Sequence, residues 1–293
     1  MTINQDWEQP KHENSSYSNL SRDYVAQVYL GILGGKESQN RIRNRLHTIA
    51  KNVKKNRVLD LGCSEGILGI ILAREGFEVT GVDIEASAIS YAKKLLEQEN
   101  KFVRNQVTYL NENIFNLQLP KKYFNTVILG ELIEHFNHPK DVIIQALNFL
   151  KPDGLLIITT PFGYLPDPDH KQTFVLSDIV KILKPLCSPE KFFIYEGYIF
   201  FIGKPLENID QAWSQIDSTY LLRHSEEALI ESQKVLRYHL DMRKTSIEQL
   251  QNQNHQLSKD NENLSSQLQL MKTDFKTSIE QLQNQNHQLS KDN

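Results

Sequence analysis

Two acids and two histidines form the most reactive group of side chains in this 293-residue sequence. Glu131, Glu134 and His135 follow directly after an apolar run at residues 124–130, which predicts a buried strand. His170 lies on a later proline-rich loop that is expected to reach the same rim of the sheet. Because carboxylates and imidazoles are ligands of divalent cations, the four side chains predict a metal site.

The same residues allow two other interpretations. His135, with Glu134 beside it, could act as a general base without any metal. Alternatively none of them is catalytic: Glu131 bonds the edge of a cofactor, Glu134 caps or pairs on a helix, and His170 only holds its loop. A cation would lower the pKa of a substrate hydroxyl and fix its direction, so we prefer the metal-assisted interpretation.

A strand, a glycine loop and a helix occupy residues 57–74, a layout typical of nucleotide-binding sites. The strand carries Asp60, and Gly62 and Gly66 follow before the helical pattern begins. The glycines let the backbone turn and let a ligand approach the helix entrance. Their spacing is GxxxG and not the GxGxxG of pyrophosphate sites, which favours an adenosyl ligand without phosphates and disfavours a nicotinamide dehydrogenase.

The next predicted strand, at residues 77–82, is followed by Asp83. An acid at this place in a βαβ unit accepts the hydroxyls of an adenosine ribose. The alternative is that Asp83 only caps the helix that begins near Ala86, where Asp is common.

Residues 58–94 resemble the first half of a class I S-adenosylmethionine-dependent methyltransferase. The resemblance continues through residues 124–129, 131–135 and 150–161, and covers roughly residues 40–204. It implies an α/β, Rossmann-like fold: a mostly parallel seven-stranded sheet with an antiparallel edge hairpin and helices on both faces. The pattern E-x-x-E-H with a later His resembles two branches, the ubiquinone-biosynthesis O-methyltransferases and the small-RNA 2′-O-methyltransferases.

The resemblance implies a role for each matching position. S-adenosyl-L-methionine is the cofactor, with its methionine end on the loop of residues 60–66 and its ribose on Asp83. Asn113 falls where many relatives carry an adenine-binding Asp, and Asn125 where an Asp of the fourth strand is usual. Mg²⁺ or a similar ion is implied on Glu131, Glu134, His135 and His170. The predicted cofactor-binding residues are Asp60, Gly62, Cys63, Ser64, Gly66, Asp83, Ile84, Asn113, Ile114 and Gly130.

The sequence also predicts the helices and strands that position these residues. Residues 1–19 are polar and predict a disordered N-terminus. A methyltransferase domain is expected at residues 20–206, opening with two helices at about 20–33 and 38–54 and closing with a hairpin at 191–203. The second helix carries Arg41, Arg43 and Arg45; one of them could meet the cofactor carboxylate, but a solvated face is preferred.

After Pro205 the composition changes to Gln, Asn, Ser, Glu and Lys. We expect a helical linker at residues 207–243 and a coiled coil at 244–293. Residues 244–261 recur letter for letter at 276–293, an offset of four heptads plus four residues, so one stutter is expected near residues 275–279. A disordered low-complexity tail is the alternative.

The predicted coiled-coil core has apolar residues at alternating three- and four-residue spacings, with Asn254 and Asn261 in the remaining core positions. Asn in a core position is typical of a two-stranded coil with a fixed register. We therefore expect a homodimer or another coiled-coil partner. The repeat ends at the last residue, which suggests a longer natural chain. The apolar core residues are Ile247, Leu250, Leu257, Leu264, Leu268, Met271 and Phe275.

Composition limits the other possibilities. The formal net charge is −3, so a nucleic-acid partner is not expected. The two cysteines, Cys63 and Cys187, are typical of a reducing compartment. No run approaches the roughly 18 apolar residues of a membrane span, and a cytoplasmic protein is predicted.

These observations predict an S-adenosylmethionine-dependent O-methyltransferase. It would transfer a methyl group to a hydroxyl of a small molecule or glycan, with assistance from a divalent cation. The alternative is a catalytically inactive methyltransferase-like scaffold whose coiled coil mediates assembly. The departures at Asn113 and Asn125 keep that alternative open, and cofactor affinity distinguishes the two.

Overall fold

The structure is a computed structural model that describes residues 24–54, 56–163, 167, 169–206, 213, 216 and 218–289. The N-terminus predicted to be disordered lies outside these residues. The helices and strands are α1 (Val25–Leu30), α2 (Lys36–Asn52), β1 (Arg57–Leu61), α3 (Ile67–Arg74), β2 (Glu78–Asp83), α4 (Ala86–Glu97), α5 (Lys101–Gln106), β3 (Val107–Asn111), β4 (Phe124–Gly130), the 3₁₀ turn η1 (Ile133–His135), α6 (Pro139–Phe149), β5 (Leu150–Pro161), α7 (Leu176–Leu183), β6 (Cys187–Tyr195), β7 (Tyr198–Pro205) and α8 (Ser218–Leu289).

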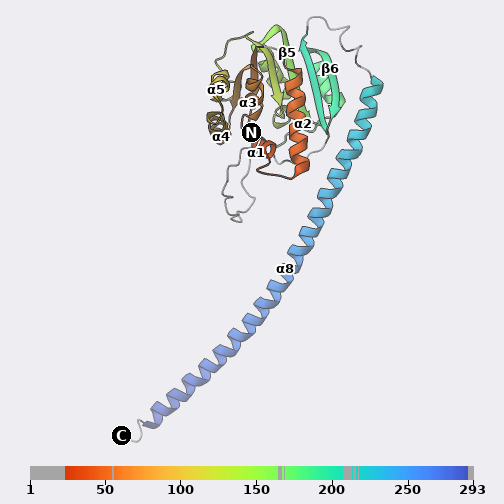
Figure 1. Cartoon of the computed structure of the whole chain (residues 1–293). Coiled ribbons are helices and arrows are strands. Elements are labelled where there is room, and N and C mark those ends of the chain that lie inside the picture. Colours follow the sequence, from red (N-terminus) through yellow and green to blue (C-terminus); the bar gives the residue numbers. More distant parts are fainter. Residues whose placement is uncertain are drawn as a thin grey trace. The chain divides into compact units, whose positions relative to one another are not determined.

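The strands form one seven-stranded sheet in the order β3-β2-β1-β4-β5-β7-β6 (Figure 1). β1 pairs in parallel with both β2 and β4, and β7 is antiparallel to both β5 and β6. Along the chain, β2 and β3 are added on one side of β1, and β4 is then added on its other side. The strand order therefore reverses next to β1, and ligands bind at the carboxyl ends of the strands at such a switch point. This topology confirms the predicted fold, including the edge hairpin.

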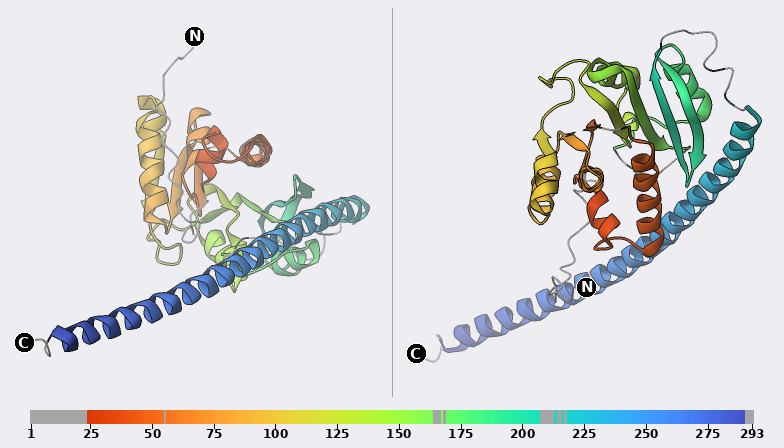
Figure 2. Two further views of the ribbon diagram at one scale, coloured as in Figure 1. Left: turned by 90° about the horizontal axis from the view of Figure 1, so that it is seen from below. Right: turned by 45° about the horizontal axis from the view of Figure 1, so that its top comes forward.

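Helices cover both faces of the sheet, and Figure 2 shows the two helical layers from other sides. Alternate residues of the central strands point to opposite faces, so Ile157 packs with α1, α2 and α3 while Ile158 packs with α6 and α7. Both residues are almost fully buried. A third cluster joins α3, α4, α5 and β3 around Tyr109. The sheet is thus held rigidly on both sides, and its carboxyl edge is a fixed platform for a site.

Most predicted elements are present with shifted ends. The first helix ends at Leu30 and not near residue 33, because Gly31 takes the left-handed conformation (φ 80°) that terminates a helix. The pairing of β5 with β4 has an irregularity between Phe124 and Thr126. α5 is a short helix that the sequence patterns did not indicate.

The chain divides into two compact units, residues 1–233 and 234–293. Helix α8 runs without a break from Ser218 to Leu289, through residues 218–243 of the predicted linker and most of the predicted coiled coil (Figure 1). Among the described residues, no helix combines the length and apolar character needed to cross a membrane.

Candidate functional site

The glycine loop between β1 and α3 is held by hydrogen bonds from its own backbone. The N–H groups of Gly62 and Cys63 both donate to the Val82 carbonyl, at 2.8 and 3.0 Å. The N–H of Gly66 donates to the Cys63 carbonyl at 2.9 Å. These N–H groups are therefore committed to the protein and do not form an anion-binding nest. The loop geometry agrees with a ligand that lacks phosphates.

Asp83, at the end of β2, closes the same loop from the neighbouring strand. Its Oδ2 accepts the N–H of Ser64 at 2.7 Å, and its Oδ1 accepts the N–H of Glu85 at 2.9 Å. The capping residue of α4 is Glu85, whose side chain accepts the N–H of Ser87. The interpretation of Asp83 as a helix cap is therefore wrong. Each oxygen of Asp83 retains a lone pair for a ribose hydroxyl.

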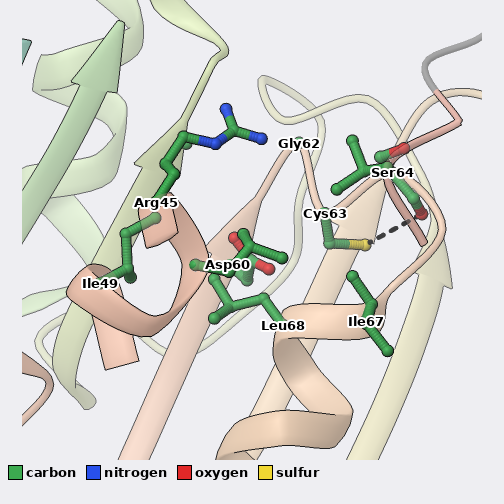
Figure 3. A pocket seen from close by; sticks show the side chains of 11 residues that line it. Arg45, Ile49, Asp60, Gly62, Cys63, Ser64, Ile67 and Leu68 are labelled. Atoms are coloured by element: carbon green, nitrogen blue, oxygen red, sulfur yellow. Dashed lines mark hydrogen bonds between the residues drawn. The ribbon is translucent and has the colours of Figure 1, made fainter. Parts of the chain in front are cut away.

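Asp60 lies at the base of a pocket that the glycine loop shares with α1 and α2 (Figure 3). Burial, with the neighbouring Asp83 as the next cause, raises the pKa of Asp60 to about 7. Arg45 acts in the opposite direction, because its positive charge favours the carboxylate. Burial likewise raises the pKa of Asp83 above its usual value. Two neighbouring carboxyl groups with raised pKa values at one loop are typical of a ligand site.

Arg45 lies in the pocket and not on the solvated face that the sequence patterns favour for the three arginines of α2. It is only 4% exposed and lines the pocket with Asp60, Gly62 and Gly130. Figure 3 shows its guanidinium extending across the pocket from α2. The spacing of the three arginines does not show which of them is buried. The position of Arg45 beside Leu46 and four residues before Ile49, both buried on α2, does indicate that Arg45 faces the interior.

The guanidinium of Arg45 is held by weak contacts. Its Nη1 lies 3.3 Å from Oε1 of Glu131, and its carbon lies 5.1 Å from the ring centroid of Tyr198. Among the described residues, Nε and Nη1 of Arg45, Oε1 of Glu131 and the hydroxyl of Thr159 are buried without a hydrogen bond. Buried polar atoms normally have partners, so this end of the pocket fits a polar ligand.

The predicted adenine side of the site lies beyond β2 and β3. Ile84 is 70% exposed, whereas Ile114 is buried in the core. Asn113 folds onto its own turn, because its Oδ1 accepts the N–H of Phe115 at 2.9 Å. The sequence patterns missed Asn111, whose amide donates to the carbonyls of Asp83 and Ile84 and so ties the two strand ends together.

Asn125 has a structural role at the other end of β4. Its Oδ1 accepts the N–H of Arg57, at 3.4 Å, and lies 3.3 Å from Nζ of Lys151. Asn125 is therefore occupied near the start of the strand, away from the carboxyl edge where Gly130 lies.

Glu134, His135 and His170 lie together beside the end of β4. Potential ligand atoms of the three side chains all fall within 4.8 Å of one another. The rings of His135 and His170 meet edge to face, with centroids 4.9 Å apart. Nδ1 of His135 lies 3.3 Å from the carbonyl of Asp169, a contact that requires a proton on Nδ1. Nε2 is then the lone-pair nitrogen that is available to a cation or a proton.

Backbone bonds bring the distant His170 to this cluster. The N–H groups of Lys171 and Gln172 both donate to the carbonyl of Glu134, at 2.8 and 3.0 Å. The side chain of Glu134 is oriented in turn by Thr160, whose hydroxyl donates to Oε2 at 3.1 Å. The loop after β5 is thus docked on η1, and this contact places His170 next to His135.

Glu131 lies outside the three-residue cluster, with its carboxylate turned toward Arg45. Its backbone adopts a left-handed φ of 54°, unusual for a residue with a side chain. Such conformations concentrate at functional sites. A fourth-ligand role for Glu131 stays a prediction.

Comparison with known proteins agrees with this architecture. A family model described as "Methyltransferase domain" matches residues 35–181, and the chain therefore belongs to this family of class I S-adenosylmethionine-dependent methyltransferases. A ubiquinone biosynthesis O-methyltransferase of Rickettsia akari is 33% identical over 38% of the chain and 42% of its own length. One from Coxiella burnetii is 30% identical over 51% of the chain and 62% of its own length.

The chain thus spans less than two thirds of the length of these curated relatives. Among solved structures, magnesium protoporphyrin IX methyltransferase from Synechocystis PCC 6803 matches with a TM-score of 0.51 and 18% identity. That match covers 62% of this chain and 92% of the other. At this identity the likeness supports the fold alone.

Proposed function

We propose that this protein transfers a methyl group from S-adenosyl-L-methionine to a hydroxyl oxygen of a small molecule or glycan, with a divalent cation such as Mg²⁺ in the site. The observation that supports it most is the joint position of two features at one sheet edge. The pocket lined by Asp60 lies at the end of β1, Asp83 closes the same loop from the end of β2, and the Glu134–His135–His170 cluster follows the adjacent β4.

The residues present fit the cofactor. When bound, S-adenosylmethionine supplies an electrophilic methyl group on a sulfonium. Asp83 would accept the ribose hydroxyls, and Arg45 would pair with the methionine carboxylate and so complete the hydrogen bonds that its buried nitrogens lack. Ile84, exposed beyond β2, would pack against the adenine ring.

The donor set also fits a divalent cation, because one carboxylate and two imidazoles converge. When bound, such an ion lowers the pKa of a coordinated hydroxyl. Glu134 and the two histidines would hold it, and Thr160 and Asp169 would fix the orientation of Glu134 and His135. In the metal-free alternative, Nε2 of His135 would take the hydroxyl proton as the oxygen bonds the methyl carbon and the bond from that carbon to the cofactor sulfur breaks, which leaves the neutral thioether.

The acceptor is proposed to carry two adjacent oxygens, as in a catechol or the vicinal diol of a sugar. Such a pair chelates one cation and leaves one oxygen directed at the methyl group. The named O-methyltransferase relatives support oxygen as the acceptor atom.

Direct titration of Mn²⁺ into the full-length protein tests the metal assignment. We expect one site per chain, lost in His170→Ala because one of three converging ligands is removed. His138→Ala is the matched control, since His138 lies three residues from His135 but outside the cluster. Absence of Mn²⁺ binding to the folded wild type, or unchanged binding in His170→Ala, contradicts the metal site. Activity that survives a chelator but is lost in His135→Ala would assign His135 as the base.

A further inference from the structure

Helix α8 carries a line of apolar side chains that nothing in the described chain covers. Nine large apolar residues between positions 247 and 282 follow the heptad spacing, and each is between 44% and 72% exposed. A single helix with such a line is not stable alone in water, because its apolar residues must be buried against another element. The nine residues, here called the α8 stripe, are Ile247, Leu250, Leu257, Leu264, Leu268, Met271, Phe275, Ile279 and Leu282.

We propose that a second copy of this chain covers the α8 stripe as a parallel coiled coil in exact register. The proposal goes beyond the enzymatic function and does not depend on it. Two copies aligned in this way bring Asn254 opposite Asn254 and Asn261 opposite Asn261, since residues in equivalent a positions face each other in a parallel pair. Each amide then meets another amide, and both its donor and its acceptor are satisfied.

Other alignments leave these amides without partners. In an antiparallel pair, a positions face d positions, which between residues 250 and 271 are all Leu or Met. Each Asn would then be buried against an apolar side chain, which leaves its amide without a hydrogen-bond partner and destabilises the pair. In a parallel pair shifted by one heptad, Asn254 of one copy faces Asn261 of the other. The remaining Asn261 then faces Leu268, and the remaining Asn254 faces Ile247.

The flanks of the stripe favour self-association over a different partner. The e and g positions, which select partners by charge, pair Gln253 with Ser258, Asp260 with Ser265, and Gln267 with Lys272 across a parallel dimer. None of these pairs brings like charges together, and none offers a charge pattern that requires a complementary chain. The stripe is therefore self-complementary, with the Asn pairs as its register signal.

Parallel pairing has a consequence for the assembly. Residues 24–206 precede α8 in both copies, so the two methyltransferase units join the coil at the same end.

Disulfide trapping in the full-length protein tests both orientation and register. Leu257→Cys places a thiol at a d position, and Lys259→Cys places one on the outer face as the matched control. The native Cys63 and Cys187 are buried and do not compete. In a glutathione redox buffer, we expect cross-linked dimer from Leu257→Cys at about tenfold or higher yield than from Lys259→Cys, because paired d positions hold the thiols at high effective concentration.

Light scattering on the wild type accompanies the trapping. A dimer mass together with selective trapping at position 257 supports the proposal. A monomer at micromolar concentration overturns it and leaves a different chain as the occupant. A dimer without trapping at position 257 overturns the parallel, in-register arrangement.

Substitution of the core amides tests the register signal itself. Asn254→Val with Asn261→Val should raise the melting temperature of the coil and give a mixture of oligomers, because a buried Asn lowers stability while it restricts the pairing. Asn252→Val, which lies on the outer face of the same helix, should leave both properties unchanged. A double variant that remains a dimer of unchanged stability contradicts a core position for these residues.

Discussion

Three ionisable side chains lie at the proposed cofactor site. Asp83 lies against the glycine loop, in which the N–H groups of Gly62, Cys63 and Gly66 already bond backbone carbonyls. Asp60 and the buried Arg45 line the adjoining pocket. This combination suits a ligand with a cationic centre and one carboxylate. It explains in physical terms why the GxxxG spacing indicates a ligand without phosphates.

The raised pKa of Asp60 predicts a pH-dependent affinity. With a pKa of about 7, Asp60 keeps its proton in the ligand-free protein up to near-neutral pH. A cationic ligand favours the carboxylate, so the affinity for S-adenosylmethionine should rise from pH 6 to pH 8, with release of a proton on binding. Calorimetry in buffers of different ionisation enthalpy measures that proton. A flat profile, or an unchanged slope in Asp60→Asn, contradicts this account.

The raised pKa of Asp60 also makes folding stability depend on pH, and this stability falls where the cofactor affinity rises. The folded protein binds more protons than the unfolded chain between pH 3.8, the ordinary pKa, and about 7. The contribution of Asp60 to stability therefore decreases as the pH rises through this window.

Arg45 is predicted to bind the cofactor carboxylate through a charge-assisted contact. Replacing it by Gln should weaken S-adenosylmethionine binding about tenfold to a hundredfold, since such contacts contribute about 1.5–3 kcal/mol. Arg43→Gln on the same helix is the control, because Arg43 is exposed and lies over Tyr29. Calorimetric titration of both variants measures the effect, and equal affinities would remove Arg45 from the site.

Tight packing around the glycine loop connects the site to the surrounding elements. A Cβ on Gly66 would lie 2.5 Å from Cζ of Tyr109 and 2.7 Å from Cβ of Ala92, and its φ of 73° disfavours any side chain. Tyr109 also donates a hydrogen bond to the Gly66 carbonyl. α3, α4 and β3 therefore meet at this one residue.

Gly66→Ala should destabilise the fold by about 2–5 kcal/mol, the sum of the strained φ and the overpacking. Gly76→Ala has a similar φ of 86° but nothing within 4 Å of the new atom, so about 1 kcal/mol is expected from strain alone. Denaturant unfolding of both variants compares the two. Equal losses would show that packing at Gly66 contributes little.

Local patterns predicted most elements well and long-range contacts poorly. The apolar runs of β1 and β4 and the glycine loop identified the sheet and the cofactor loop, because their signals lie within a few residues. The burial of Arg45 depends on how α2 packs on the sheet, which no local spacing records. The bonds from Gln27 to the buried Glu65 likewise join residues far apart in sequence and were not foreseen.

For the whole molecule, the internal repeat and the heptad spacing predicted a long helix, and the structure confirms its continuity from Ser218. The sequence and structure of one chain do not identify the partner of this helix, because the partner is a separate chain. The sequence also predicts that His170 and His135 lie close together, because both are expected at the same edge of the sheet. It does not predict the hydrogen bonds to the Glu134 carbonyl that bring them together.

We propose that the loop between β1 and α3, closed by Asp83, binds S-adenosylmethionine. Titration of this cofactor into the full-length wild type and into Asp83→Asn, with matched unfolding curves for both, measures this binding. We expect one site per chain in the wild type and an affinity at least about tenfold lower in the variant, since one charged ribose acceptor is removed. Absence of binding to the folded wild type would contradict the methyltransferase function and leave the scaffold alternative.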